Sequence, residues 1–356
     1  MNTVEYQQVL GRALELPLSE LATTVPADAS ELRRSSAADG LRLLLAGAHS
    51  LAAMLGESYA PSVGSLRATT ERACALAMAG EYDQLTAVLA ELLPGLEAAV
   101  RTVPAGLRSD AYELTAMAYQ ACSAALMKLD EPLAAWVAAD RAMAAAEKAG
   151  NLLLAAGSQY RLAEVFLDCR EYALADEMAR SSMIALRGLA EVGDPDALSL
   201  CGGLTLLRAA VAARTRRPAA AYGHVAKARL LASRLGTRRA KAMPEFGAQY
   251  VALYEIGVSV DLGDAGHALR AAACLDAASL PPGRLARMLI DVARAFALSE
   301  QVDKATAALK RAMELGPCQV RDHDRACQVI GELLTIRTPP PRALIALAKR
   351  VGALPA

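Results

Sequence analysis

The chain has 356 residues, of which 54% are hydrophobic and only 4% aromatic, a composition rich in the helix formers alanine and leucine. β-branched and aromatic residues are too sparse for many strands. Lys and Arg together number 38, as do Asp and Glu, so the chain lacks the basic excess of a dedicated nucleic-acid binder.

The N-terminal residues predict a protein that remains in the cytoplasm. Residues 1–20 carry charges and no apolar core run, so we expect no signal peptide. The apolar stretch at 41–55 is interrupted by Arg42 and His49 and is shorter than the roughly 20 residues that a membrane span needs. The seven cysteines are scattered singly, which is typical of reduced thiols.

The chain divides into three predicted parts. Residues 1–35 form a short helical stub and a linker, residues 36–338 a helical repeat domain, and residues 339–356 a proline stop followed by a capping helix. Within the repeat domain, turn signals recur about 37 to 50 residues apart, the scale of helix-hairpin repeats. These signals stand at 80–82, 129–132, 169–172, 216–218, 262–264 and 299–301.

The second helix of each unit shows one shared pattern, in which small residues alternate with Leu, Met or Val at helical spacing. In residues 133–146, LAAWVAADRAMAAA, the alanines permit close helix approach. We expect Trp136 to wedge between hairpins and Gly150-Asn151 to end the helix. A hairpin of this kind buries its apolar face only against the next hairpin. The sequence therefore predicts an all-α, tetratricopeptide-like helical-hairpin solenoid of about six hairpins with an N-terminal helical extension.

Polar and aromatic residues on the first helices are the candidate ligand-binding set, because these helices line the concave side of such arrays. Tyr250 and Tyr254 are i,i+4 neighbours on one helical face, and tyrosine rings suit peptides or flat apolar ligands. An alternative is that Arg161 and Glu164 form a surface ion pair and that the tyrosines only pack between repeats. The full set is Tyr119, Gln159, Tyr160, Arg161, Glu164, Arg208, Gln249, Tyr250, Tyr254 and Glu255.

Signals for catalysis, metals and cofactors are weak. No nucleophile, zinc-protease, phosphate-loop or dinucleotide motif is found. Cys318, His323 and Cys327 match no common zinc spacing. Gly202-Gly203 lies within a helical run, where we expect close helix packing. We predict no catalytic residue, no metal and no cofactor, and the balance is against an enzyme.

Four stretches carry a resemblance to a known family: DEPLAAWVAADRAMAAAEKAGN at 130–151, SQYRLAEVFL at 158–167, and residues 246–269 and 284–315. They resemble actinobacterial regulators that carry an Xre/Cro-type helix-turn-helix ahead of a tetratricopeptide-like sensor domain. The family is similar, more distantly, to the peptide-pheromone receptors of Gram-positive bacteria. This resemblance implies a short peptide bound in the concave groove.

The resemblance has two departures. VLGRALELPLSEL at 9–21 resembles the end of an Xre-type domain, but only eight residues precede it, so we expect a stub and no DNA binding from this chain alone. Gln249-Tyr250-Val251 and Tyr254 stand where the family pattern has Thr-Asn-Val and a His, so phenols replace two polar contacts.

These observations predict a regulatory protein, related to transcriptional regulators, whose concave groove binds a peptide, a small-molecule signal or a protein partner. A homodimer is compatible with this function. The alternatives are a pathway-specific enzyme or small-molecule carrier built on the same helical array, and a protein-interaction scaffold.

Overall fold

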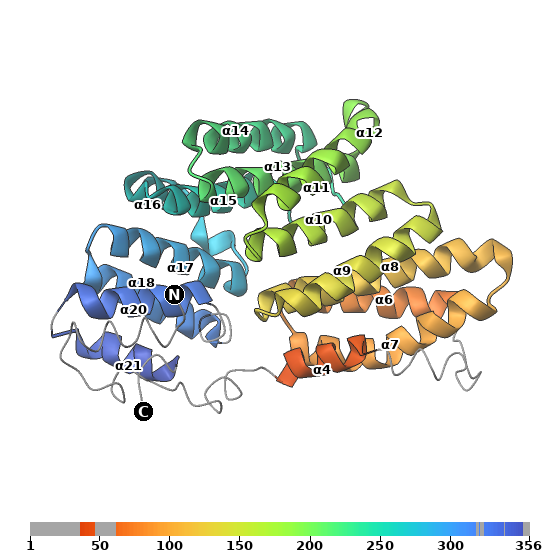
Figure 1. The fold of residues 1–356 in the computed structure, drawn as a ribbon, viewed down its shortest axis with the longest axis horizontal. Coiled ribbons are helices and arrows are strands. Elements are labelled where there is room, and N and C mark those ends of the chain that lie inside the picture. The colour runs from red at the N-terminus through yellow and green to blue at the C-terminus, as the bar shows by residue number, and fades with distance from the viewer. Residues whose placement is uncertain (1–35, 47–61, 318–319, 321–323, 338, 352–356) are drawn as a thin grey trace, which may run out of the picture. The chain divides into compact units, whose positions relative to one another are not determined.

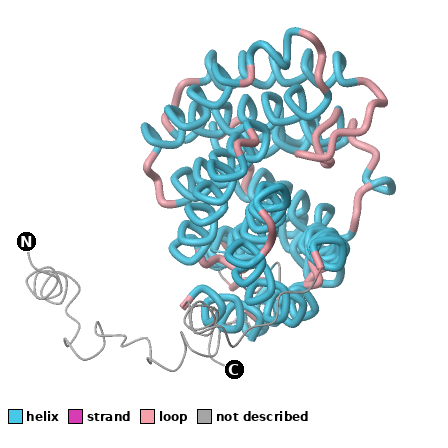
Figure 2. Tube along the Cα trace, turned by 90° about the vertical axis from the view of Figure 1, so that its right-hand side faces the viewer, coloured by secondary structure: helices cyan, strands magenta, loops and turns pink. Residues whose placement is uncertain are grey.

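A computed structural model describes residues 36–46, 62–317, 320, 324–337 and 339–351. Among these residues every regular element is a helix (Figure 2). The chain divides into two units, Met1–Arg34 and Ser35–Ala356, and the first unit, with the predicted stub at 9–21, lies outside the described residues. The helices of the second unit are α4 (Ser36–Leu45), α6 (Val63–Ala79), α7 (Tyr82–Thr102), α8 (Ala105–Lys128), α9 (Pro132–Ala149), α10 (Leu152–Asp168), α11 (Tyr172–Ala185), α12 (Arg187–Glu191), α13 (Pro195–Arg214), α14 (Pro218–Leu235), α15 (Ala248–Leu262), α16 (Ala265–Ala273), the short η1 (Ala277–Ser279), α17 (Pro282–Leu298), α18 (Val302–Leu315), α20 (Asp324–Ile336) and α21 (Arg342–Arg350).

The helices form consecutive pairs that stack along the chain (Figure 1). Each first helix packs against the first helix of the next pair, and each second helix packs against its own first helix and the next one. The predicted tetratricopeptide-like solenoid is therefore confirmed. The described residues contain seven pairs rather than about six, because α20, which the turn signals did not separate, pairs with α21. The pairs are α6–α7, α8–α9, α10–α11, α13–α14, α15–α16, α17–α18 and α20–α21.

Alanine is the residue that lets neighbouring pairs approach. Helix α9 buries one side made almost wholly of alanines, among them Ala135, Ala138 and Ala142. Trp136 lies between pairs as expected, with its ring edge-on to that of Phe166 on α10 at 5.4 Å between centroids. It keeps 45% of its surface exposed, so it is a wedge at the margin of the core rather than within it.

The turns within pairs depend on left-handed backbone conformations. Asp130, Arg170, Arg216 and Glu300 each have φ between 55° and 64° in the tight turn between two helices. The connection from the α8–α9 pair to the α10–α11 pair also uses a left-handed residue, because Gly150 takes φ 69°. There the side chain of Asn151 accepts a hydrogen bond from the backbone N–H of Leu154 at 3.1 Å. These local devices fix where each helix stops and the next begins.

Helix α13 is the most deeply buried helix of the stack. It is long and apolar enough to cross a membrane by length and composition, but 89% of that stretch is buried inside the fold. A Cβ on Gly202 would lie 1.9 Å from Cζ of Phe246, and one on Gly203 would lie 2.3 Å from Sδ of Met243. The glycine pair therefore accommodates side chains from the connection between α14 and α15 and, at Gly203, also the ring of Tyr160 on the neighbouring helix α10, whose Cε2 would lie 3.3 Å from the added Cβ.

That connection, residues 236–247, is fixed to the start of α13. The carboxylate of Asp196 accepts hydrogen bonds from the backbone N–H groups of Lys241 and Ala242, the latter at 2.9 Å. Arg238 donates to the carbonyl oxygen of Gly193 at 2.7 Å. Phe246 is 5% exposed, so the connection is an integral part of the core.

Candidate ligand-binding face

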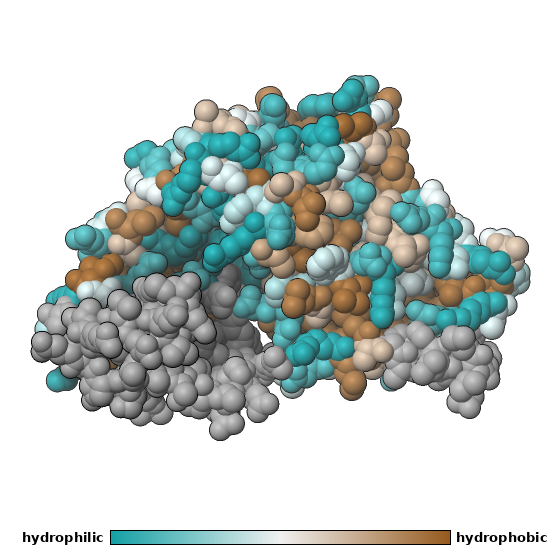
Figure 3. Space-filling model, viewed as in Figure 1, coloured by the Kyte–Doolittle hydropathy of each residue, from teal (hydrophilic) through white to brown (hydrophobic). Residues whose placement is uncertain are grey.

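The first helices α8, α10, α13, α15 and α17 lie next to one another in sequence order and form one continuous surface, called here the first-helix face. Figure 3 shows hydrophilic side chains gathered in a hollow between α10 and α17. Polar side chains on these helices therefore meet others that are far away in the chain.

Three tyrosines from two helices meet on this face and are called here the tyrosine cluster: Tyr160 of α10, and Tyr250 and Tyr254 of α15. The hydroxyls of Tyr160 and Tyr250 are 3.4 Å apart and share a hydrogen bond. The rings of Tyr250 and Tyr254 are tilted at 48°, with centroids 5.1 Å apart. The structure thus brings together three predicted site residues that are separated by up to 94 positions in the sequence.

The tyrosine cluster is joined to the ion pair between Arg161 and Glu164. One oxygen of Glu164 accepts from Nη1 of Arg161 at 2.7 Å, and the other accepts from the hydroxyl of Tyr160 at 3.1 Å. The guanidinium of Arg161 also lies 5.3 Å from the centre of the Tyr160 ring. The predicted pair therefore forms, and it forms as part of the face rather than as an isolated surface contact.

Burial keeps the phenols of the cluster neutral. Burial first, and Glu164 second, raise the pKa of Tyr160 well above its ordinary value. Burial and the neighbouring Tyr254 do the same to the pKa of Tyr250, and burial raises that of Tyr254. At neutral pH the cluster consequently offers hydrogen-bond donors and acceptors on aromatic rings, and no phenolate that would act as a base.

Additional charged residues, which sequence analysis did not single out, surround the cluster. Arg284 of α17 lies with its guanidinium 5.3 Å from the centre of the Tyr250 ring. Lys128, the last residue of α8, is exposed to solvent, yet Arg287 of α17 first and the surrounding protein second lower its pKa to about 7. Glu245, in the connection 236–247, acts in the opposite direction and raises the pKa of Lys128. The spacing of Arg284 and Arg287, one helical turn apart, could have indicated from the sequence that two cations share one side of this helix.

An ionic network joins the C-terminal ends of the first helices. One oxygen of Asp261 on α15 accepts from Arg294 of α17 at 2.8 Å, and the other accepts from Arg214 of α13 at 3.4 Å. Arg294 also donates to Asp291 at 2.9 Å, and Arg214 to the carbonyl oxygen of Leu167 on α10 at 2.7 Å. Asp261 is only 11% exposed, so a single carboxylate holds three consecutive pairs in register.

The change Asp261→Asn is expected to lower the free energy of unfolding by about 1 to 2 kcal/mol, because two arginines lose the charge that both of them contact. Urea denaturation followed by circular dichroism at 222 nm measures this loss. The control is Asp303→Asn, whose carboxylate pairs with Arg337 at an exposed site and is expected to cost less than about 0.5 kcal/mol. Equal losses in the two variants would contradict the role of Asp261.

The other predicted residues contact neighbouring helices. Tyr119 is 2% exposed and donates to Glu97 at 3.3 Å, while Gln159 accepts from Ser182 of α11. Arg208 pairs with Asp176 at 2.7 Å. Gln249 donates to the hydroxyl of Ser279, the last residue of η1. Their proposed contact with a ligand stays a prediction, and the tyrosine cluster with Arg161 and Glu164 is the part of the set that the structure assembles.

Glu255 lies in a separate polar group beside the second helices. It accepts from Arg229 at 2.7 Å and lies 3.1 Å from Nε2 of His267. Together with Arg270 and Cys274 it borders an open pocket of about 280 Å³. The tyrosine cluster does not contribute to this pocket.

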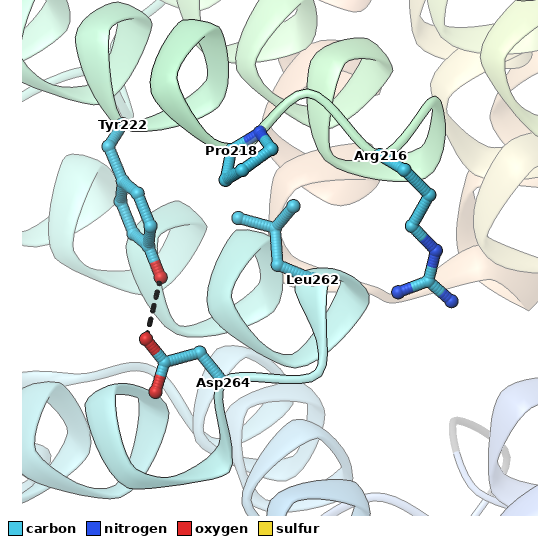
Figure 4. Close-up of a pocket in the computed structure, with 5 residues that line it drawn as sticks. All are labelled: Arg216, Pro218, Tyr222, Leu262 and Asp264. Atoms are coloured by element: carbon cyan, nitrogen blue, oxygen red, sulfur yellow. Dashed lines mark hydrogen bonds between the residues drawn. The ribbon is translucent and has the colours of Figure 1, made fainter.

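A second open pocket, of about 310 Å³, lies at the turns of the α13–α14 and α15–α16 pairs (Figure 4). The hydroxyl of Tyr222 donates to Asp264 at 3.2 Å on one side of it, and Pro218 and Leu262 lie between this pair and Arg216. The guanidinium of Arg216 points away from the hydrogen-bonded pair. The lining groups do not converge on a common point, so this pocket is a weaker candidate than the first-helix face.

Within the described part of the chain, no group of three or more His, Cys, Asp or Glu side chains is placed to hold a metal ion. Cys318 and His323, two members of the weak metal-like spacing, lie outside the described residues.

No protein-family model matches the sequence, and no curated protein matches it. The fold is similar to that of a Rap protein in the crystal structure of its complex with Competence and Sporulation Factor. The match has a TM-score of 0.52 and covers 82% of this chain and 87% of the Rap chain, at 14% sequence identity. At that identity the similarity shows the helical-repeat fold alone.

Proposed function

We propose that this chain is a cytoplasmic regulatory protein, related to the Xre-type regulators that its sequence resembles, and that its first-helix face binds a peptide signal. The tyrosine cluster is the observation that carries the proposal. It presents aromatic rings and neutral hydroxyls from two helices at one place, flanked by charged side chains. A peptide offers what such a surface recognises, namely apolar side chains and backbone hydrogen-bonding groups.

The similarity to the Rap protein supports this proposal as an analogy of fold. That protein was crystallised with Competence and Sporulation Factor, so a helical array of this type accommodates a bound factor. The raised pKa values of the three phenols favour binding over catalysis, since a general base near neutral pH needs a lower pKa.

The regulatory step follows from the way the pairs stack. Tyr160 belongs to α10 and Tyr250 to α15, and α13 lies between these helices. A ligand that contacts both helices favours one spacing of the pairs over others, and it thereby shifts the population of the array toward that spacing. Surfaces on the second helices, where a partner or a second copy docks, move with the pairs.

Removal of the cluster is expected to abolish ligand binding without unfolding the array. In thermal-shift measurements with pools of random synthetic pentapeptides, the wild type is expected to be stabilised, whereas Tyr250→Ala and Arg161→Ala are expected to show no shift. Circular dichroism checks that both variants stay helical.

The control is Tyr172→Ala, which removes a half-buried tyrosine at the start of a second helix. It is expected to keep the peptide-induced shift. A shift of equal size in all four proteins would remove the cluster from the binding site.

A further inference from the structure

Helix α14 lies at the outer edge of the stack, beside α12 (Figure 1). It packs mainly against α13 and α15, and its opposite side is open to solvent. That open side carries Leu230, which is 67% exposed, with Lys227 one turn before it and Arg234 one turn after it. Helix α14 contains no acidic residue along its whole length. Its outward side therefore combines an apolar group with positive charge that no residue of the same helix offsets.

Arginine side chains join this side of α14 to the end of α12. Arg234 donates to the carbonyl oxygen of Ala190 at 2.8 Å, and Arg238 donates to that of Gly193 at 2.7 Å. Val192 lies between these two carbonyl groups in the chain, and its side chain is 82% exposed. The two open apolar side chains and the cations consequently share one surface. It is called here the α12–α14 face and consists of Val192, Lys227, Leu230, Arg234 and Arg238.

The cations of the α12–α14 face have no acidic partner within the described residues. Lys227, Arg234 and Arg238 form no ion pair there. The oxygens that hold the two guanidinium groups are backbone carbonyls, which carry no net charge. Both arginines are exposed, so their positive charge stays available to a partner.

The acidic residues around the face do not neutralise these cations. The carboxylates of Asp194 and Asp196 accept hydrogen bonds from backbone N–H groups, at 2.8 and 2.9 Å. Glu255 of α15 is paired with Arg229 at 2.7 Å. Glu191 is exposed and forms no ion pair within the described part of the chain. The face therefore keeps an excess of positive charge beside its two open apolar side chains.

An acidic, amphipathic helix complements such a surface. Its apolar side chains would cover Leu230 and Val192, and its carboxylates would pair with the planar forks of the arginines and with the lysine. A nucleic acid supplies phosphates but no group that covers an exposed leucine and valine. A second copy docked through the same face would bring cations against cations, which is unfavourable.

We propose that the α12–α14 face docks an acidic, amphipathic helix of a partner protein. Leu230 and Val192 form the apolar anchor, while Lys227, Arg234 and Arg238 select a negatively charged partner. The docking face goes beyond the proposed peptide site and does not depend on it, because the tyrosine cluster lies on the first helices α10 and α15.

The test uses three pools of synthetic helix-forming peptides of about 18 residues, long enough to form a helix in solution. Retention by the full chain is measured by affinity selection and mass spectrometry. The first pool has random apolar residues along one helical face and Glu on the others, the second has Lys in place of Glu, and the third has the composition of the first with its apolar residues scattered. The wild type is expected to retain the first pool about tenfold better than either of the others.

Leu230→Gln and Lys227→Glu are expected to abolish the preference for the first pool. Both side chains are exposed, so the variants stay folded, which circular dichroism checks. The matched controls are Leu133→Gln on α9, where the leucine is 69% exposed, and Lys310→Glu on α18, where the lysine is exposed. They make the same changes on other second helices and are expected to keep the preference.

The outcomes separate the docking face from the peptide site. Tyr250→Ala, which disrupts the tyrosine cluster, is expected to retain the first pool as the wild type does. Loss of retention in this variant would place the helices on the first-helix face and overturn the docking face. Equal retention of the three pools by the wild type, or an unchanged preference in Leu230→Gln and Lys227→Glu, overturns it as well.

Two further measurements address the other occupants. In gel-shift experiments the wild type is expected not to bind a random-sequence DNA duplex. Binding that Lys227→Glu abolishes and Leu230→Gln keeps would make the face a nucleic-acid surface instead. Size-exclusion chromatography reports a second copy, and a dimer that Leu230→Gln dissociates would make the face an interface between copies of this chain.

Discussion

Replacing Gly202 by valine is expected to lower the free energy of unfolding by about 3 kcal/mol, the largest loss we expect from a single added side chain. The new Cβ would lie 1.9 Å from Cζ of Phe246 and within 2.4 Å of two further ring atoms. Helix α13 is packed on all sides, so the Phe246 ring is the group that must move. Overpacking costs about 1 to 3 kcal/mol, and loss of a buried phenylalanine costs about 3 to 5 kcal/mol. Urea denaturation followed at 222 nm measures the change.

The control is Gly223→Val in α14, where an added Cβ meets nothing within 4 Å. Its stability is expected to stay within about 0.5 kcal/mol of the wild type, because the site is an exposed helical position. In the double variant Gly202→Val/Phe246→Ala, the two losses are expected to sum to less than their separate values, since the alanine removes the clash. Strict additivity would show that Phe246 is not the group displaced.

The fold was predictable because its determinants are local. Gly150 with Asn151, and Asp130 in the turn before α9, mark helix ends through backbone conformation and capping alone. The alanines of α9 then leave a single way to bury its apolar side, which is to pack against the adjacent pairs. Each pair packs mainly against its neighbours along the chain, so a correct local prediction extends to the whole array.

The candidate site was only partly predictable. Tyr250 and Tyr254 share one helical face at i,i+4, and this relation is visible in the sequence. Gln159 and Arg161 are two residues apart on α10, so they point to different sides of the helix, and only Arg161 joins the tyrosine cluster. A list of polar residues on a first helix does not show which of them face the cluster. That depends on how the helix is rotated about its own axis, which the sequence alone does not give.

The remaining features of the site depend on long-range geometry. Arg287 lowers the pKa of Lys128 across the stack of α8, α10, α13, α15 and α17, and small rotations between successive pairs decide whether two such charges come near each other. The Gly202-Gly203 pair suggested a close approach, but nothing in the local sequence indicated that Phe246 and Met243 would supply the contacting atoms. Connections of this length take their path from the surface they cover, not from a repeating pattern.

Replacing Arg287 by methionine is expected to raise the pKa of Lys128 from about 7 toward its ordinary value, because Arg287 is the first cause of the lowered pKa and loss of hydration the second. The other charged groups that act on Lys128 are Arg161 and Glu164 from α10 and Glu245 from the connection 236–247. Asp168 at the end of α10 interacts with the same lysine. The two glutamates raise the pKa of Lys128, so their effect is no longer opposed by Arg287 in the variant.

An NMR titration of the protein labelled with ε-¹³C-lysine measures this pKa, and Lys128→Met assigns the signal of Lys128. The control is Arg187→Met, which removes an exposed cation from α12 and is expected to leave the pKa of Lys128 unchanged. The same pKa in the wild type and in Arg287→Met would show that Arg287 does not act on Lys128, whereas a rise in Arg287→Met alone shows that charges on α8 and α17 interact across the stack of first helices.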